Sequence, residues 1–254
     1  MTDTKKTKIL AVAGKGGVGK TSISAAFVRI LSEKYPDKKI LAIDADPAVG
    51  LSGALGFEPE LTLDDIRKRI ARSISDGNTR EAVELLNEAK FHMLDAVTER
   101  GNISFIAIGR PESAGCYCKV NAYLKEVIEM ISENYDFVVI DSEAGIEQIN
   151  RRVMEKISCL VLVSDRSKRG INVINTVKEV ADSIMTYEKC GVIFNRVPID
   201  FVCDNPVKGA EVLSLIGDDG EQSENDMFGK TVFELNENSL MYKGVYNAYE
   251  KLYN

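Results

Sequence analysis

The residues best suited to chemistry lie near the start of the chain, in the segment GKGGVGKTS at residues 14–22. Its spacing, G-x-x-x-x-G-K-[ST], is that of a loop whose backbone N–H groups point at phosphate oxygens, helped by the positive end of a following helix. Lys20 is then expected to reach the β- and γ-phosphates, and the Thr21 hydroxyl to ligate Mg²⁺. The predicted nucleotide contacts are Gly14, Lys15, Gly16, Gly17, Val18, Gly19, Lys20, Thr21 and Ser22.

Two apolar runs end in aspartates that could serve the same site. FVVIDSEAG places Asp141 at the end of a run, where a carboxylate can hold the hydration shell of Mg²⁺. LAIDADP places Asp44 and Asp46 at the end of another run. The stretch from Ser142 to Gly145 resembles a second switch loop, in which Gly145 could change its backbone conformation when a γ-phosphate is present.

A pair of cysteines forms the second candidate site. Cys116 and Cys118 lie in GRPESAGCYCKVN, a glycine-containing stretch before a predicted helix. In extended backbone, residues i and i+2 point the same way, so both sulfurs could face one ligand. Two thiolates do not complete the tetrahedral shell of a transition metal, but a two-fold dimer would supply two more. Unrelated loop thiols and a redox pair are the alternatives.

Composition excludes several classes of site and partner. The 254 residues carry 32 Lys and Arg against 39 Asp and Glu, a net charge of -7, so we expect no nucleic-acid or membrane partner. The single histidine, His92, cannot build a three-His zinc site in a monomer, and its neighbours in FHMLDAV predict a packing or surface role. The apolar runs are too short to span a membrane, and the five cysteines accompany no export signal. We therefore expect a cytoplasmic protein with reduced thiols.

The elements that must position these residues alternate along the chain. Strands are predicted at 8–13, 39–44, 103–109, 137–141, 159–165 and 191–195, and helices at 20–35, 78–98, 119–134, 146–157 and 168–187. Several strands are apolar throughout, which indicates burial on both faces of a parallel sheet. The pattern predicts a single α/β domain over residues 1–254, doubly wound around a mostly parallel sheet. The stretch 196–238 is expected to hold an edge element and an acidic surface loop, before a closing helix that packs Leu240, Val245, Tyr249 and Leu252.

Lys15, directly after the first glycine, carries a resemblance to a known family. A lysine there resembles the deviant loop of the nitrogenase iron protein, the MinD and ParA partitioning ATPases and metal-insertion ATPases. The resemblance implies that Lys15 reaches the nucleotide of a partner subunit, where its charge would neutralise the leaving phosphate, so that the active form is a homodimer closed by ATP. It also implies that Asp46 positions the attacking water, although the sequence leaves Asp44 open for that role.

The same family places an asparagine after the strand GVIFN, which corresponds to Asn195. Its side-chain amide would contact adenine, because an amide presents a donor and an acceptor side by side. Arg196 follows it and is expected to contact the nucleotide as well. A turn asparagine at the end of a strand is the alternative.

The stretch from Gly109 to Gly170 resembles one branch, the CooC-type nickel-insertion ATPases of carbon monoxide dehydrogenase and acetyl-CoA synthase maturation. The matching segments are GRPESAGCYCKVN, YDFVVIDSEAG, INRR and LVSDRSKRGI. The resemblance implies a nickel or zinc ion between the cysteine pairs of two subunits, delivered to a client metalloenzyme as ATP closes and hydrolysis opens the dimer. Ser142, Gln148 and Gly217 depart from the pattern of that branch.

Two other functions remain open at this point. An ATP-dependent reductase resembling nitrogenase iron protein would hold an iron-sulfur cluster between subunits, but residues 141–152 contain no cysteine. A positioning ATPase of the MinD or ParA type would need a basic membrane-seeking tail or a basic patch for DNA, whereas this tail is rich in tyrosine.

Overall fold

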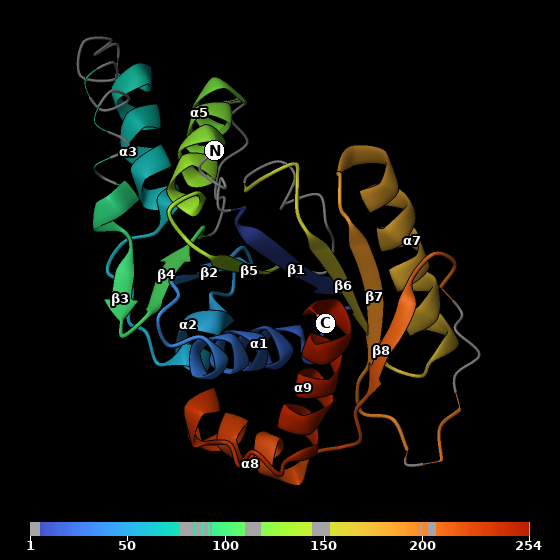
Figure 1. Ribbon diagram of the computed structural model, residues 1–254. Coiled ribbons are helices and arrows are strands. Elements are labelled where there is room, and N and C mark those ends of the chain that lie inside the picture. The colour runs from blue at the N-terminus through green and yellow to red at the C-terminus, as the bar shows by residue number, and fades with distance from the viewer. Residues whose placement is uncertain are drawn as a thin grey trace, which may run out of the picture.

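The computed structural model describes residues 6–76, 84, 88, 91, 93–109, 118–143, 153–198, 200–202 and 207–253. These residues form an α/β fold around an eight-stranded sheet with the order β3-β4-β2-β5-β1-β6-β7-β8 (Figure 1). The strands are β1 (Lys8–Gly14), β2 (Ile40–Asp44), β3 (Thr98–Arg100), β4 (Ile103–Ala107), β5 (Phe137–Asp141), β6 (Cys159–Ser164), β7 (Lys189–Phe194) and β8 (Glu211–Leu215). Neighbouring strands pair in parallel, except that β3 pairs antiparallel with β4. The predicted fold class is confirmed.

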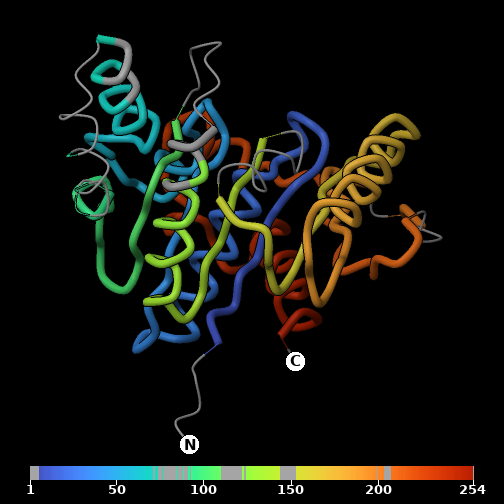
Figure 2. Tube along the Cα trace, turned by 90° about the horizontal axis from the view of Figure 1, so that it is seen from above, coloured from blue at the N-terminus to red at the C-terminus, as the bar shows by residue number. Residues whose placement is uncertain are grey.

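Helices cover both faces of the sheet, which explains the continuous apolar strands. Every residue of β2, β4, β5 and β6 is buried. One face packs against α1 (Lys20–Lys34), α2 (Gly50–Leu55) and α9 (Leu240–Tyr253). The other packs against α3 (Leu63–Ser75), α5 (Cys118–Ser132) and α7 (Lys168–Ile184). In Figure 2, α3 and α5 lie side by side, and α7 lies apart from them at the other end of the sheet. None of the helices in the described part of the chain is long and apolar enough to cross a membrane.

The six predicted strands are confirmed to within two residues at each end, and the helices predicted at 20–35, 119–134 and 168–187 to within three. The other two helix predictions need correction. Of the helix predicted at 78–98, the described residues 84, 88, 91 and 93–95 are helical, but residues 96 and 97 are not, and Thr98 begins β3. Residues 153–157, at the end of the helix predicted for 146–157, are not helical, and Lys156 forms an isolated bridge with Thr186. The short α2 and the amphipathic α3 were not predicted.

The C-terminal region is more regular than the sequence indicated. The expected edge element is β8, but part of the expected acidic loop forms α8 (Gly220–Phe228). Asp219 caps this helix by accepting a hydrogen bond from the Gln222 N–H, and Gly229 ends it in the left-handed conformation. A 3₁₀ turn (Val232–Glu234) leads to α9, the predicted closing helix. Its Val245, Tyr249 and Leu252 are buried as expected, whereas Leu240 is 49% exposed.

The parallel strands bring the candidate residues to one edge of the sheet. Gly14, Asp44, Asp141 and Ser164 end β1, β2, β5 and β6, and Asn195 follows β7. In open α/β sheets, ligands bind beside the carboxyl ends of the strands.

Candidate functional site

The loop at residues 14–19 has a backbone that favours glycine at three positions. Gly14, Gly17 and Gly19 have φ values of 144°, 75° and 92°. A Cβ atom on Gly14 would lie 2.1 Å from the carbonyl oxygen of Val163, so the loop packs directly against β6. No side chain caps α1, which begins at Lys20. The N–H groups of its first turn are therefore available to an anion.

Lys20 is held inside this loop. Its side chain is 6% exposed, and its Nζ donates a hydrogen bond of 3.1 Å to the carbonyl oxygen of Lys15. Burial lowers the pKa of Lys20, while the carboxylates of Asp141 and Asp46 oppose that shift. The ammonium is thus placed in the loop without a side-chain ion pair in the described structure, which favours a negatively charged ligand.

Thr21 and Asp141 form the centre of a possible Mg²⁺ site. The Thr21 Oγ1 and the Ser24 Oγ donate hydrogen bonds of 2.7 and 2.8 Å to the two carboxylate oxygens of Asp141. Asp141 is fully buried, and burial raises its pKa to about 6 in spite of these bonds. A buried carboxylate beside a hydroxyl is a donor set that suits Mg²⁺, so the residues present fit this ion.

Asp44 supports the neighbouring loop. It is the register partner of Asp141 across β2 and β5, and it is also fully buried. Its carboxylate accepts hydrogen bonds from the N–H groups of Asp46 (3.1 Å) and Leu51 (2.8 Å). Burial, followed by the charge of Asp141, raises the pKa of Asp44 to about 7. Asp44 thus fixes the turn that presents Asp46.

Asp46 itself is half-buried, and its carboxylate accepts a hydrogen bond of 2.8 Å from the Ala48 N–H. This places a carboxylate near the strand ends that carry Asp44 and Asp141. Its role in positioning water stays a prediction.

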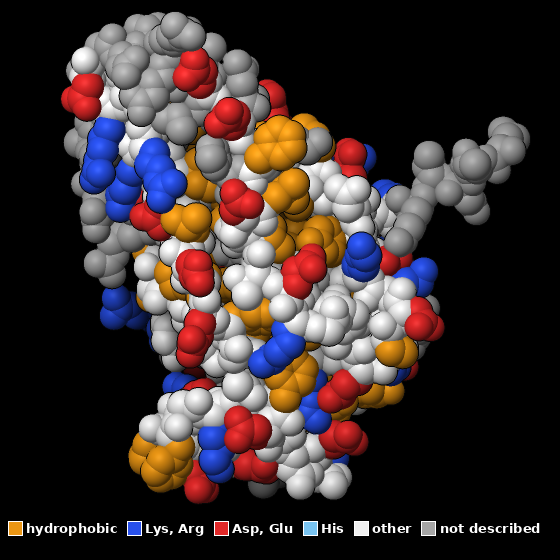
Figure 3. Space-filling view, turned by 90° about the vertical axis from the view of Figure 1, so that its left-hand side faces the viewer, with side chains coloured by type: hydrophobic (Ala, Val, Ile, Leu, Met, Phe, Trp, Pro, Cys, Tyr) orange, Lys and Arg blue, Asp and Glu red, His pale blue; other side chains and the backbone are white. Residues whose placement is uncertain are grey.

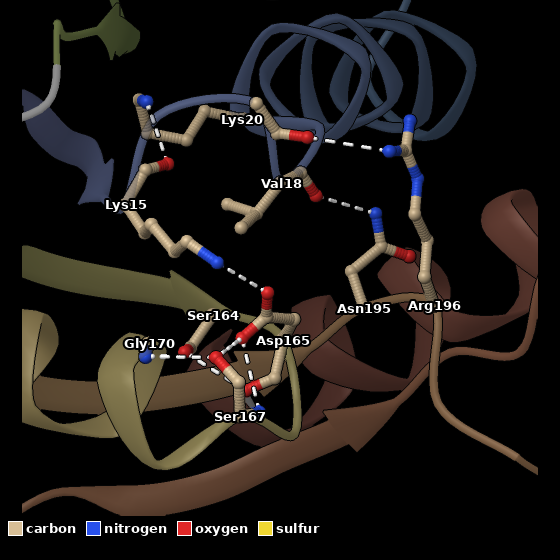
Figure 4. A network of polar contacts seen from close by, with 10 residues as sticks. Lys15, Val18, Lys20, Ser164, Asp165, Ser167, Gly170, Asn195 and Arg196 are labelled. Atoms are coloured by element: carbon tan, nitrogen blue, oxygen red, sulfur yellow. Dashed lines mark hydrogen bonds and ion pairs between the residues drawn. The ribbon is translucent and has the colours of Figure 1, made fainter.

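Lys15 lies on the opposite side of the loop from α1 and meets a residue that sequence reasoning did not assign. Its Nζ forms a 2.5 Å ion pair with Asp165, just after β6 (Figure 4). The side chains are 29% and 30% exposed. Asp165 is held in turn by Ser167, which caps α7 by accepting a hydrogen bond from the Gly170 N–H. In the segment SDRS, a serine two residues after an aspartate is a capping signal that could have marked this turn.

Asn195 and Arg196 contact the loop at residues 14–19, called the phosphate loop below, on the side away from Lys15 (Figure 4). The buried Asn195 Nδ2 donates a hydrogen bond of 2.8 Å to the Val18 carbonyl oxygen, and the Arg196 Nη1 donates one of 3.3 Å to that of Gly17. The two residues also line a shallow groove with Gly217, Asp218 and residues of α8. The bracing contacts were missed by sequence reasoning. The adenine contact stays a prediction, for which the Asn195 Oδ1 would be the acceptor.

The cysteine pair lies at the limit of what the structure describes. Helix α5 begins at Cys118, while Cys116 and the side chain of Cys118 lie outside the described residues. The described part of the chain holds no cluster of three or more metal-ligating side chains. Cys159 and Cys190 are free thiols, the first buried and the second half-buried.

Comparisons with known proteins now assign the family. The sequence model of the AAA domain family matches residues 7–189. The chain is a P-loop ATPase of the AAA domain family. An uncharacterized ATP-binding protein of Methanocaldococcus jannaschii is 33% identical to this ATPase, over 97% of this chain and 98% of the relative.

Two further relatives bear on function and fold. The carbon monoxide dehydrogenase accessory protein CooC of Rhodospirillum rubrum is 26% identical to this ATPase, covering 82% of this chain and 81% of CooC. The septum site-determining protein MinD of Pyrococcus horikoshii, solved with Mg-ADP, matches the fold with a TM-score of 0.70. That match has 22% identity and covers 98% of this chain and 97% of MinD, so it supports the architecture only.

Proposed function

We propose that this ATPase closes as a homodimer around ATP and uses the cycle to deliver a thiophilic metal ion, nickel or zinc, to a client metalloenzyme. The client would be of the carbon monoxide dehydrogenase or acetyl-CoA synthase type. The observation that carries the proposal is the arrangement of the two loop lysines. Lys20 is buried within its own subunit, whereas Lys15 lies partly exposed on the other side of the loop. The similarity to CooC supports the metal cargo.

Each residue of the site has a distinct part in hydrolysis. Lys20 and the N–H groups of the loop bind the β- and γ-phosphates. Thr21 and Asp141 would hold Mg²⁺, which supplies positive charge to the phosphates when bound. Asp46 orients the water whose oxygen bonds to the γ-phosphorus as the bond to ADP breaks. Lys15 of the partner subunit supplies charge to the oxygens of the phosphate that leaves.

The segment that leads to Cys116 and Cys118 leaves the sheet close to the residues of the nucleotide site. The Ile108 N–H, just after β4, donates a hydrogen bond of 2.8 Å to the Asp44 carbonyl oxygen. Gly109 follows with φ 84°, and a Cβ there would lie 2.6 Å from the Thr62 hydroxyl oxygen. The chain that leads to Cys116 and Cys118 is therefore fixed at its base to the strand end that presents Asp46. A movement of Asp46 would therefore displace the start of the segment that leads to the two cysteines.

The cargo would be bound by thiolates from both subunits. Two cysteines from each copy give four sulfur ligands, which suit zinc and other thiophilic metals. Opening of the dimer after hydrolysis would separate the two pairs and release the ion to the client.

Metal analysis of the anaerobically purified protein tests the cargo. We expect nickel or zinc at about one ion per dimer for the wild type, from four thiolates per shared site. The C116A/C118A variant should lose the metal, while Cys190→Ala, the matched control on β7, should keep it. Equal metal content in the wild type and in C116A/C118A would contradict metal delivery. An oxygen-sensitive brown dimer containing iron and sulfide would instead favour the reductase.

A positioning role is the second candidate, since MinD of Helicobacter pylori is 24% identical over 82% of this chain. On the face seen in Figure 3, basic and acidic side chains are interspersed. Co-sedimentation with anionic vesicles, or DNA retardation, in the presence of ATP would favour this role. Neither is expected for a chain with a net charge of -7.

A further inference from the structure

We propose that Asp165 is a positioning residue that holds the Lys15 ammonium against its own subunit until nucleotide-bound subunits meet. Asp165 would then set how readily the dimer closes. This inference rests on the proposed function, because it assumes that Lys15 acts on the nucleotide of the partner subunit.

The Asp165 carboxylate is fixed so that one oxygen faces Lys15. Its Oδ1 accepts hydrogen bonds from the Ser167 N–H (3.0 Å) and from the Ser167 Oγ (2.5 Å). Its Oδ2 pairs with the Lys15 Nζ at 2.5 Å. The two oxygens thus have separate partners, and the first set anchors the carboxylate for the second.

The anchor belongs to the turn between β6 and α7. Ser167 is the N-cap of α7, and the Ser164 Oγ donates a hydrogen bond of 2.9 Å to the Asp165 carbonyl oxygen. A Cβ on Gly170 would lie 2.3 Å from the Asp165 Oδ1 and 2.6 Å from the Ser164 Oγ. Glycine at position 170 therefore leaves the space in which the Asp165 side chain sits. The turn between β6 and α7 is shaped around this carboxylate.

The ion pair between Lys15 and Asp165 is weak enough to break when the dimer closes. An ammonium bound to Asp165 of its own subunit is not free to contact a phosphate in another, so closure of the dimer has to separate the pair. Because both side chains are about 30% exposed, water and salt screen their attraction. Such a pair shifts an equilibrium by only about 1.4- to 5-fold, and the several negative charges of a triphosphate can outcompete a single carboxylate.

Substitution of Asp165 by asparagine isolates the ion pair. The amide side chain of D165N would retain an Oδ1 acceptor for Ser167 and would lose only the charge that attracts Lys15. With two such pairs per dimer, we expect D165N to tighten the dimer dissociation constant about 2- to 30-fold with a non-hydrolysable ATP analogue. Asp182→Asn is the matched control, since Asp182 forms an ion pair with Lys178 further along α7. It should leave the dissociation constant unchanged.

A double-mutant cycle ties the effect to Lys15. In a Lys15→Ala background, where the dimer is weak, D165N should change the residual dimer dissociation constant no more than D182N does. A D165N dimer that is unchanged or weaker than the wild type would overturn the proposal, as would tightening that persists without Lys15.

A second readout works on the nucleotide-free monomer and so does not depend on the proposed function. We would measure the rate at which Lys15 reacts with an amine-acylating reagent, using peptide mass spectrometry. D165N should raise that rate up to about fivefold, while D182N should not. An unchanged rate would show that Asp165 does not restrain Lys15. A raised rate in a protein that never dimerises would support the restraint and contradict the dimeric mechanism instead.

Discussion

The two lysines of the phosphate loop lie five residues apart and differ in how the fold holds them. Lys20 is buried, and its ammonium donates a hydrogen bond to a main-chain carbonyl oxygen. The uncapped N-terminus of α1 lies beside it. The region around Lys15 is partly open to solvent and depends on an ion pair with a carboxylate 150 residues away in the sequence. The Lys20 site is therefore preformed for a ligand. The ion pair between Lys15 and Asp165, in contrast, has to break before Lys15 can contact the nucleotide of a partner subunit.

This contrast assigns nucleotide binding to Lys20 and closure of the dimer to Lys15. A buried ammonium in a preformed loop gains a phosphate partner without rearrangement, so Lys20 serves affinity for the nucleotide. A screened surface pair exchanges partners at small cost, so Lys15 can respond to whether a second subunit is present. Variants of the two lysines should therefore fail in different ways.

The largest effect is expected for Lys20→Ala. Loss of the ammonium that contacts the phosphates should lower ATPase activity by about 10³-fold or more and abolish measurable binding of a fluorescent ATP analogue. The melting temperature should stay the same or rise, because the change removes a buried charge. Retention of ATP affinity would show that the phosphates do not bind beside Lys20.

Lys15→Ala should lower ATPase activity by roughly 10²-fold and leave affinity for ATP within about threefold of the wild type. The reason is that Lys15 is expected to contact the partner's nucleotide rather than its own. Titration with a fluorescent ATP analogue, at a protein concentration that keeps the chain monomeric, separates the two quantities. A large loss of affinity would place Lys15 at its own nucleotide and remove the distinction between the two lysines.

A smaller effect concerns the buried carboxylate of Asp44. Folding raises the pKa of Asp44 from 3.8 to about 7, so between these values the folded protein binds more protons than the unfolded chain. The stability of the nucleotide-free protein should therefore fall as pH rises from about 4 to about 7, by up to about 1.4 kcal/mol per pH unit from this group. Asp44→Asn should flatten this dependence in urea unfolding. Parallel curves for the two proteins would contradict the assignment.

The smallest effect is expected for Ser24→Ala, which removes one hydrogen bond to Asp141 from the buried side. We expect the free energy of unfolding to fall by about 1 kcal/mol at pH 8 and by less at pH 5, where Asp141 is protonated. Ser132→Ala is the control, because the buried Ser132 hydroxyl donates to the uncharged Ile128 carbonyl oxygen. Its cost should not change between the two pH values.

The sequence was sufficient for features that depend on local pattern. The six strands were predicted because each is a short apolar run, and the loop at 14–22 because its glycines and Lys20 have a fixed spacing. Helix α8 was missed although Asp219 and Gln222 have the spacing of a cap, since the acidic composition of that stretch favoured a loop.

Features that depend on distant segments could not be predicted in this way. The pairing of Lys15 with Asp165, and the bond from Asn195 to Val18, join residues about 150 and 177 positions apart. Only the parallel order β1-β6-β7 brings these segments to the same edge of the sheet. Local spacing contains no information on that order, which is why Lys15 had a predicted partner in another subunit and none in its own.

The central claim, that ATP closes a dimer through Lys15, is tested most directly by the mass of the protein in solution with a non-hydrolysable ATP analogue and Mg²⁺. Light scattering should give twice the chain mass of 28.0 kDa for the wild type and a nucleotide-bound monomer for Lys15→Ala. A wild type that stays monomeric when saturated with the analogue, or a Lys15→Ala variant that dimerises equally well, would contradict the account.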